Sequence, residues 1–176
     1  MKGHPKPEDS RESPRYFQLS TPVGRLWVAH EDGAVCLSML GGTEDAFVEL
    51  ARRRLRRVLR YHPSPPGVLM ATIHARLHGN ALLAFNLDGE TSFRRAVLEA
   101  VAAIPRGEVR TYAQVAAAVG RPRAARAVGE VMRTNPIPVL IPCHRVVRTG
   151  GNLGNYTPDP ELKRQLLEWE GAFARG

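Results

Sequence analysis

The sequence predicts a two-domain α/β protein: an N-terminal α/β domain with a small antiparallel sheet and a helix, then a mainly helical C-terminal domain. Short apolar runs separated by turn signals occupy residues 16–40, whereas apolar residues recur at helical spacing from Thr91 onward. The boundary therefore falls near residue 90, which gives domains of residues 16–90 and 91–176. Residues 1–15 are polar and contain proline, so we expect a short disordered tail there.

The N-terminal domain is expected to begin with three strands. Their apolar centres are Tyr16–Leu19, Leu26–Ala29 and Val35–Leu40, and the turn signals Thr21–Gly24 and Glu31–Gly33 separate them. Helical spacing then predicts a helix over 47–59, from the apolar residues Phe47, Leu50, Ala51, Leu55, Val58 and Leu59. The arginines between them are better explained by a solvated face than by contact with nucleic acid. Residues 68–90 are less legible, and 81–87 fit either a further strand or a linker.

The C-terminal domain is expected to contain a helix-turn-helix. A helix over 93–104 ends at Pro105-Arg106-Gly107. A capping box from Thr111 to Gln114 starts a short helix that ends at Gly120. Pro122 suits the first position of a second helix, which extends to about Arg133. Two short helices joined by a tight turn are typical of a helix-turn-helix, although any helical hairpin has the same pattern.

The second helix of this pair is expected to have an apolar face and a charged face. The residues expected to pack inward are Ala124, Ala127, Val128 and Val131. The residues expected to face outward are Arg123, Arg126, Glu130 and Arg133. Three of these four outward residues are arginines, which favours contact with phosphate.

Positive charge is concentrated around this helix pair. The chain has a net charge of +8 at pH 7, and residues 105–150 carry eight arginines against only Glu108 and Glu130. A guanidinium binds phosphate oxygens and stays charged, so this distribution is typical of a protein that contacts a nucleic-acid backbone. A high-GC genome that favours arginine codons explains the total charge equally well, but it does not explain the concentration in one segment.

The sequence also argues against several classes of protein. Its longest apolar stretches, such as Ile137–Pro142, are far shorter than the roughly 18–20 residues that span a bilayer, so no membrane contact is expected. The N-terminus has no apolar region of a secretory signal. Two cysteines cannot build a disulfide framework, which favours a reducing, cytoplasmic location. His74 and His78 have no cysteine or carboxylate cluster nearby, and we expect no metal site.

The segment Pro142–Val147 contains the candidate nucleophile. Cys143 is followed by His144 and Arg145, and positive charge favours the thiolate, which is the nucleophilic form of cysteine. A structural cysteine in a core turn is an equally good interpretation of these residues alone, because sequence neighbours rarely form a catalytic Cys–His pair. Cys36 lies in an apolar alternating stretch and is expected to be a core residue.

Pro142-Cys143-His144-Arg145-Val146-Val147 resembles the active-site signature of the O6-alkylguanine-DNA alkyltransferases, or methylated-DNA–protein-cysteine methyltransferases. Three further motifs match that family's pattern: Arg126–Gly129, Asn135-Pro136 and Gly154–Tyr156. The resemblance is specific over residues 91–171 and looser over 16–90, where it implies a ribonuclease-H-like domain. It implies irreversible, single-turnover transfer of the alkyl group from O6-alkylguanine, and from O4-alkylthymine, to Cys143. It also implies a monomer that binds double-stranded DNA and needs no cofactor.

The resemblance further implies catalytic roles for five residues. Cys143 would accept the alkyl group, His144 would deprotonate it through a bound water, and Glu170 would hold the imidazole in the right tautomer. Asn135 would brace the turn before the active-site segment, and Tyr112 would help to rotate the base and favour protonation at guanine N3. The backbone from Val146 to Thr157 would line the guanine pocket, with Tyr156 near the base and Thr157 donating a hydrogen bond to its O6. The full set implied for the pocket is Arg145, Val146, Val147, Asn155, Tyr156 and Thr157.

The same resemblance implies how DNA would be bound. The recognition helix of this family enters the minor groove, and Arg126 would fill the gap left by a nucleotide flipped out of the duplex. Arg123 and Arg133 are expected to bind phosphates. The small residues that would allow close approach to the groove are Ala124, Ala125, Ala127 and Gly129.

The chain departs from the family pattern at two places. Pro158-Asp159-Pro160 stands where many members have Gly-Gly, so we expect a stiffer pocket loop and an altered range of alkyl groups. Asp159 is expected to cap, and Pro160 to begin, a last helix that ends at Gly171. Phe93-Arg94 and Val97-Leu98 stand where the family has Phe-Gln and Val-Trp, so Arg94 and Leu98 are the departures, and we interpret them as a packing change. Two other functions stay open, a helix-turn-helix transcription regulator and a sensor that binds alkylated DNA without transfer, although such sensors lack the acceptor cysteine.

Overall fold

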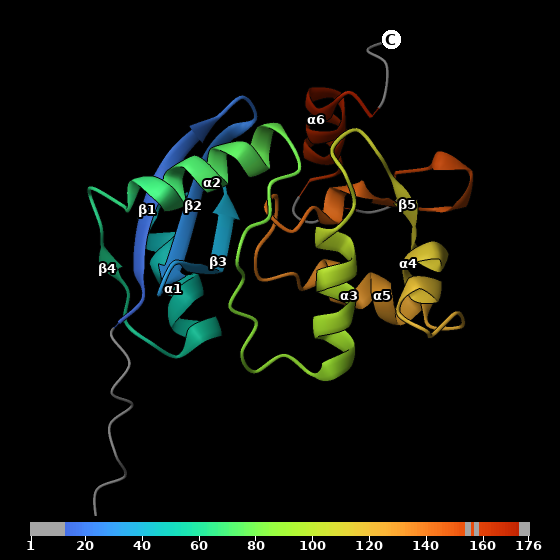
Figure 1. Cartoon of the computed structure of the whole chain (residues 1–176), viewed down its shortest axis with the longest axis horizontal. Coiled ribbons are helices and arrows are strands. Elements are labelled where there is room, and N and C mark those ends of the chain that lie inside the picture. The colour runs from blue at the N-terminus through green and yellow to red at the C-terminus, as the bar shows by residue number, and fades with distance from the viewer. Residues whose placement is uncertain (1–12, 154–155, 157–158, 173–176) are drawn as a thin grey trace, which may run out of the picture.

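The computed structural model describes residues 13–153, 156 and 159–172. It is a mixed α/β structure in which a small sheet lies beside six α-helices (Figure 1). The sheet has four strands in the order β3-β2-β1-β4, namely β1 (Arg15–Thr21), β2 (Gly24–Glu31), β3 (Ala34–Leu40) and β4 (Arg60–Tyr61). β2 is antiparallel to β1 and β3, whereas β4 runs parallel to β1. The three predicted strands and the turns between them are confirmed.

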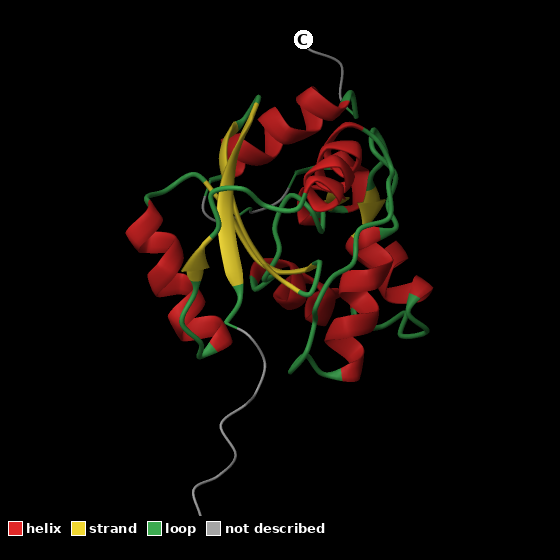
Figure 2. Ribbon diagram, turned by 60° about the vertical axis from the view of Figure 1, so that its left-hand side comes forward, coloured by secondary structure: helices red, strands yellow, loops and turns green. Residues whose placement is uncertain are grey.

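Helices cover both faces of this sheet because its strands are apolar on both sides (Figure 2). Successive residues of a strand point to opposite faces, so Tyr16 and Phe17 belong to different apolar clusters. α1 (Glu44–Leu55) packs Phe47 into the cluster that contains Tyr16. α2 (Gly67–His78) packs Ile73 into the cluster that contains Phe17.

Two predictions for the N-terminal half are wrong in detail. The helix expected over 47–59 ends at Leu55, because Arg56 adopts a left-handed conformation with φ of 53° that turns the chain away. Val58, expected to pack inward, is 75% exposed as a result. Residues 67–78, which had no legible pattern, form α2. Its buried residues, Leu69, Ile73, Arg76 and Leu77, lie on one face of the helix, but this face includes an arginine and the apolar Val68 lies outside it.

The segment 81–87, for which either a strand or a linker was expected, has features of both. Phe85 forms an isolated parallel bridge with Val35 of β3. The Val35 amide donates to the Ala84 carbonyl at 2.9 Å, and the Asn86 amide donates to the Val35 carbonyl at 2.8 Å. The segment is therefore a linker that is attached to the edge of the sheet at one point.

The C-terminal half contains four α-helices and a two-stranded sheet. Its elements are α3 (Ser92–Ala102), β5 (Arg110–Thr111), α4 (Tyr112–Ala118), α5 (Ala125–Arg133), the 3-10 helix η1 (Cys143–Arg145), β6 (Val146–Val147), the 3-10 helix η2 (Thr149–Gly151) and α6 (Pro160–Glu170). The predicted capping box is confirmed by reciprocal hydrogen bonds between Thr111 and Gln114. The predicted start of α6 is confirmed as well, since Asp159 Oδ1 accepts a hydrogen bond from the Glu161 amide and Pro160 is the first helical residue.

α5 differs from its prediction in two respects. It begins at Ala125 instead of Pro122, because the preceding residues form a turn in which the Ala124 amide donates to the Arg121 carbonyl at 2.8 Å. Val128 and Val131 are buried as expected, but Ala127 is exposed, so its predicted inward packing is wrong.

One apolar cluster joins the N-terminal and C-terminal halves. It contains β1, β2 and α2 residues together with residues of α3, α4, α5 and α6. This packing fixes the position of the C-terminal helices against the sheet. In the described part of the chain, every helix is too short or too polar to cross a membrane.

Candidate active site

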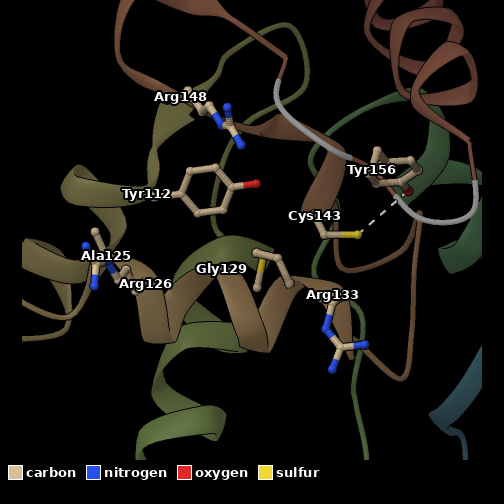
Figure 3. Close-up of a pocket in the computed structure, with 9 residues that line it drawn as sticks. Tyr112, Ala125, Arg126, Gly129, Arg133, Cys143, Arg148 and Tyr156 are labelled. Atoms are coloured by element: carbon tan, nitrogen blue, oxygen red, sulfur yellow. Dashed lines mark hydrogen bonds between the residues drawn. The ribbon is translucent and has the colours of Figure 1, made fainter.

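A cavity of about 510 Å³ lies where α4 and α5 meet the chain around Cys143 (Figure 3). The described residues that line it are Tyr112, Ala125, Arg126, Gly129, Met132, Arg133, Cys143, Arg148 and Tyr156. A β-carbon on Gly129 would lie 3.8 Å from the ring of Tyr112, so the helix passes close to this aromatic side chain. The cavity therefore brings together residues that are up to 44 positions apart, from Tyr112 to Tyr156.

Cys143, the candidate nucleophile, lines this cavity and is only 5% exposed. Its Sγ atom lies 3.7 Å from Tyr156 Oη, within hydrogen-bonding distance for sulfur. Burial raises the pKa of the Cys143 thiol, although hydrogen bonds with Asn135 and Tyr156 and the charge of Lys163 oppose this rise. The thiol is therefore protonated at neutral pH, and it needs a base to become a nucleophile.

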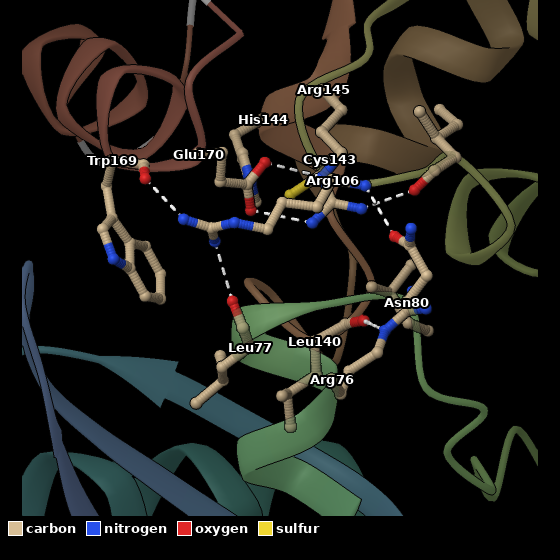
Figure 4. Close-up of polar contacts among 12 residues, drawn as sticks. Arg76, Leu77, Asn80, Arg106, Leu140, Cys143, His144, Arg145, Trp169 and Glu170 are labelled. Carbon is tan, nitrogen blue, oxygen red and sulfur yellow. Dashed lines mark hydrogen bonds and ion pairs between the residues drawn. The ribbon is translucent and has the colours of Figure 1, made fainter.

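The adjacent His144 is held by a carboxylate from α6 (Figure 4). His144 Nε2 lies 3.0 Å from Glu170 Oε1, and the histidine is completely buried. The same carboxylate accepts hydrogen bonds from Arg145, with Nε–Oε2 at 2.7 Å and Nη2–Oε1 at 2.8 Å. One buried glutamate thus fixes two consecutive side chains of the cysteine segment.

These contacts determine the protonation of His144. Burial lowers the pKa of His144 more than the attraction of Glu170 raises it, so the ring is neutral at pH 7. Burial alone would raise the pKa of Glu170, but hydrogen bonds from His144 and Arg145 outweigh it and lower that pKa to about 2. A neutral ring that donates from Nε2 to this carboxylate has an unprotonated Nδ1. His144 Nδ1 is buried and has no hydrogen-bond partner among the described residues, so its lone pair is available to accept a proton.

The chain before Cys143 is held through its carbonyl groups. Asn135 Nδ2 donates to the Ile141 carbonyl at 2.8 Å, while Asn135 Oδ1 accepts from the Ile137 amide at 3.0 Å. Arg76 of α2 donates from Nε to the Leu140 carbonyl at 3.2 Å (Figure 4). The turn between α5 and the cysteine is therefore fixed from both halves of the chain.

α5 presents charged and small side chains to solvent along the cavity. Arg126 and Arg133 line the cavity and are exposed. Arg133 also pairs with Glu130, with Arg133 Nε 2.9 Å from Glu130 Oε2. Arg123 and Ala124 lie in the turn before the helix, where Arg123 is exposed and Ala124 is half-buried. This surface has the charge to hold phosphates and few large side chains to obstruct them.

The structure describes four of the six residues expected in the guanine pocket. Tyr156 lines the cavity, whereas Asn155 and Thr157 lie outside the described residues. Arg145 is a correction, because its buried guanidinium binds Glu170 and the Ile104 carbonyl and does not face the cavity. Val146 and Val147 are buried in β6, and their side chains are not part of the lining.

Three site residues were missed from the sequence. Arg148 and Met132 line the cavity. Lys163 is completely buried, and its Nζ donates to the Val146 carbonyl at 2.6 Å and to the Leu153 carbonyl at 2.7 Å. Burial lowers the pKa of Lys163 to about 8. The available signal for it was its rarity, since the only other lysines of this arginine-rich chain are Lys2 and Lys6.

Cys36 lacks the surroundings that make Cys143 reactive. It lines a separate cavity of about 610 Å³ in which no histidine is among the described lining residues. Burial raises the pKa of its thiol to about 12. The prediction of a core residue is confirmed, since Cys36 is 6% exposed and packs in the cluster on the α1 side of the sheet. Both cysteines are unpaired.

Comparison with protein families identifies the C-terminal half. A family model described as the 6-O-methylguanine DNA methyltransferase DNA-binding domain matches residues 92–172. A methylated-DNA–protein-cysteine methyltransferase of Salmonella typhimurium is 34% identical over 167 residues, which are 88% of this chain and 94% of the relative. The human protein of the same name is 51% identical over 83 residues, or 47% of this chain and 40% of the human protein.

Solved structures are similar over almost the whole chain. The crystal structure of Mycobacterium tuberculosis OGT in complex with DNA is 29% identical, with a TM-score of 0.71 over 90% of this chain and 93% of that chain. The O6-methylguanine-DNA methyltransferase of the archaeon Pyrococcus kodakaraensis is 27% identical, with a TM-score of 0.68 over 90% of this chain and 99% of that chain. The similarity therefore includes the N-terminal sheet, which the family model does not match.

Proposed function

The chain belongs to the family of methylated-DNA–protein-cysteine methyltransferases, and from this membership we propose that it repairs DNA by direct alkyl transfer. The alkyl group of O6-alkylguanine in double-stranded DNA moves to Cys143 in one irreversible turnover. The observation that supports this proposal best is the buried Cys143 thiol in the cavity, next to a neutral His144 whose Nδ1 is free to accept a proton among the described residues.

The proposed reaction is a displacement at the alkyl carbon. His144 Nδ1 takes the thiol proton through a bound water, and the Cys143 sulfur attacks the alkyl carbon in line with the bond to O6. The S–C bond forms while the C–O6 bond breaks, and the bonding electrons remain on guanine. The proton then passes to guanine, assisted by Tyr112 at N3, so the products are a neutral guanine and a thioether. Orientation and hydrogen bonds to the departing guanine supply the catalysis, and no cofactor enters the balance.

The alkyl group lies inside the base stack of a duplex, so we propose that the nucleotide is flipped out before transfer. α4 and α5, joined by the turn at 119–124, then act as a helix-turn-helix whose second helix enters the minor groove. Arg126 fills the gap in the duplex, and Arg123 and Arg133 bind phosphates. The exposed arginines on this turn and helix support the assignment.

Further properties of the family complete the proposal. We propose a monomer that also accepts O4-alkylthymine, with the strands of the N-terminal half arranged as in a ribonuclease-H-like domain. Two unpaired, buried cysteines support a reducing compartment such as the cytoplasm.

Intact mass spectrometry after mixing with DNA that contains O6-methylguanine tests the function. The protein is expected to gain one methyl group, and the Cys143→Ser variant to gain none while it still binds DNA, because a hydroxyl supplies almost no anion at neutral pH. Cys36→Ser is the matched control and is expected to gain the methyl group. If the Cys36 variant were inactive and the Cys143 variant active, the assignment of the nucleophile would be reversed.

A further inference from the structure

Arg148 lies on the wall of the cavity that faces α5 (Figure 3). The parallel pairing of β5 with β6 puts Thr111 opposite Val147, so the residues that follow, Tyr112 and Arg148, lie together on this wall. Burial raises the pKa of the Tyr112 hydroxyl, and the charge of Arg148 opposes that rise. The fold therefore holds a guanidinium close to an aromatic residue that the proposed function already uses.

The main chain of Arg148 is fixed by a closed turn. Its amide donates to the Asn152 carbonyl at 2.9 Å, and its carbonyl accepts from the Gly151 amide at 3.2 Å. Gly150 and Gly151 have φ of 82° and 78°, which glycine adopts without strain. The side chain itself is exposed and forms no ion pair or hydrogen bond with the residues that the structure describes. A fixed backbone thus presents an unpaired guanidinium at the cavity.

The other two arginines of the cavity come from the opposite wall. Arg126 and Arg133 both belong to α5, and the charge of Arg133 is partly neutralised by Glu130. Arg148 is therefore the guanidinium of the loop wall, separated from the two helix arginines by the opening that leads to Cys143 (Figure 3).

We propose that Arg148 binds a backbone phosphate next to the extruded nucleotide. The inference rests on the proposed function and adds a second wall to the DNA site. A nucleotide whose alkyl carbon reaches the buried Cys143 sulfur leaves its own phosphates at the cavity mouth, because they remain bonded to the strand. Arg148 is exposed at this mouth, and a guanidinium matches the oxygens of a phosphate in charge and geometry. The damaged strand is then held between α5 and Arg148.

Methylphosphonate substitution tests the contact, because it removes the charge of one chosen phosphate. Three duplexes with one O6-methylguanine are compared: unmodified, neutral at the phosphate 5′ to the lesion, and neutral at the phosphate 3′ to it. Second-order rate constants of alkyl transfer are measured for the wild type and for Arg148→Ala. Relative to wild type with the unmodified duplex, we expect Arg148→Ala to react roughly five- to tenfold more slowly. One of the two methylphosphonates is expected to slow the wild type by a similar factor. Together they are expected to cause no further loss.

Two controls separate this contact from a general effect. Free O6-benzylguanine has no phosphate, so the loss caused by Arg148→Ala is expected to be smaller with this base than with the unmodified duplex. Arg53→Ala removes an exposed guanidinium of α1, outside the cavity, and is expected to keep the full methylphosphonate effect. If the wild type transfers the methyl group but the loss caused by Arg148→Ala multiplies with the loss caused by each methylphosphonate, the proposed contact is overturned. Absence of transfer from the unmodified duplex to wild type would instead overturn the proposed function.

Discussion

In the proposed reaction, Glu170 acts on Cys143 through His144, although it does not touch the sulfur. Its ionised carboxylate accepts one hydrogen bond from His144 and two from Arg145, and all three residues are buried. The carboxylate makes the Nε2–H form of His144 the favoured neutral tautomer and leaves Nδ1 to act as the base. On this proposal Glu170 is a positioning residue whose effect reaches the thiol through the imidazole.

Replacing Glu170 with glutamine tests this role. Glu170→Gln removes the charge and allows the other imidazole tautomer, so we expect transfer from O6-benzylguanine to slow by about 10- to 100-fold. Single-turnover kinetics with the free base measures this change without any contribution from DNA binding. A wild-type rate in a folded Glu170→Gln protein would show that His144 is not oriented through this carboxylate.

The lowered pKa of Glu170 also predicts how the free energy of unfolding depends on pH, and Glu170→Gln is the variant that tests it. The pKa of Glu170 is lowered to about 2 in the folded state, against an ordinary value of roughly 4.3 in the unfolded chain. A depressed folded pKa contributes stability that is fully present above about pH 4.3 and is lost as the pH falls toward 2. We expect the difference in unfolding free energy between wild type and Glu170→Gln to shrink by up to about 3 kcal/mol over this range. Denaturant titrations at several pH values measure it, and a constant difference would contradict the prediction.

Individual site residues were predictable where a short motif carried them. Cys143 and His144 are adjacent in sequence, and the resemblance to a family supplied distant Glu170. Arg148 and Lys163 were not predictable, because their importance depends on where β6 and α6 pack. Arg145 was misplaced for a related reason: its closeness in sequence to Cys143 does not show that its side chain binds Glu170 and leaves the cavity.

At the scale of elements, α5 has exposed and small side chains on the side where it lines the cavity. Arg126 and Ala127 are exposed, and Gly129 packs against Tyr112. A helix with such a surface can approach nucleic acid closely while its buried side keeps Val128 and Val131 in the core. The late start of the helix at Ala125 leaves Arg123 in the preceding turn, so Arg123 and Arg126 have different surroundings.

This difference predicts distinct effects of two arginine variants. Arg126→Ala is expected to slow transfer from saturating duplex by at least about tenfold, because the proposed role of Arg126 is to stabilise the flipped state, and to spare free O6-benzylguanine. Arg123→Ala is the matched variant and is expected mainly to weaken DNA binding, by about 1 kcal/mol. Single-turnover rates and binding titrations on both substrates measure these effects. Equal losses of Arg126→Ala with duplex and free base would mean that Arg126 supports the active-site fold instead.

Elements with local signals were predicted well, and elements defined by distant contacts were not. The capping box of α4 and the Asp159-Pro160 start of α6 are formed by residues close in sequence, and both are confirmed. α2 was not predicted because its buried face includes Arg76, which donates to the Leu140 carbonyl, and because the apolar Val68 is exposed, so the sequence shows no clean apolar face. The end of α1 depends on the conformation of one residue, Arg56, and had no sequence signal.

At the scale of the whole molecule, hydrogen bonds as well as the shared apolar cluster connect the parts of the chain before and after residue 90. Buried Arg76 of α2 binds the Leu140 and Ala102 carbonyls, both in the C-terminal half. In the opposite direction, Arg106 donates from Nη1 to the Leu77 carbonyl of α2 at 2.8 Å and places its guanidinium over the ring of Trp169 (Figure 4). The division into domains near residue 90 stays a prediction.

These ties and the shared core predict one cooperative thermal transition for the whole chain. Scanning calorimetry is expected to give equal calorimetric and van't Hoff enthalpies. Arg76→Met leaves buried carbonyls without their donor, so it should lower the melting temperature by about 5 °C without splitting the transition. Two separate transitions, or a fragment of residues 91–176 that melts like the full chain, would contradict this prediction. If the chain unfolds in a single transition, the site around Cys143 is lost only when the N-terminal sheet unfolds. A sheet that contributes no residue to the proposed reaction then sets the temperature up to which the protein can react.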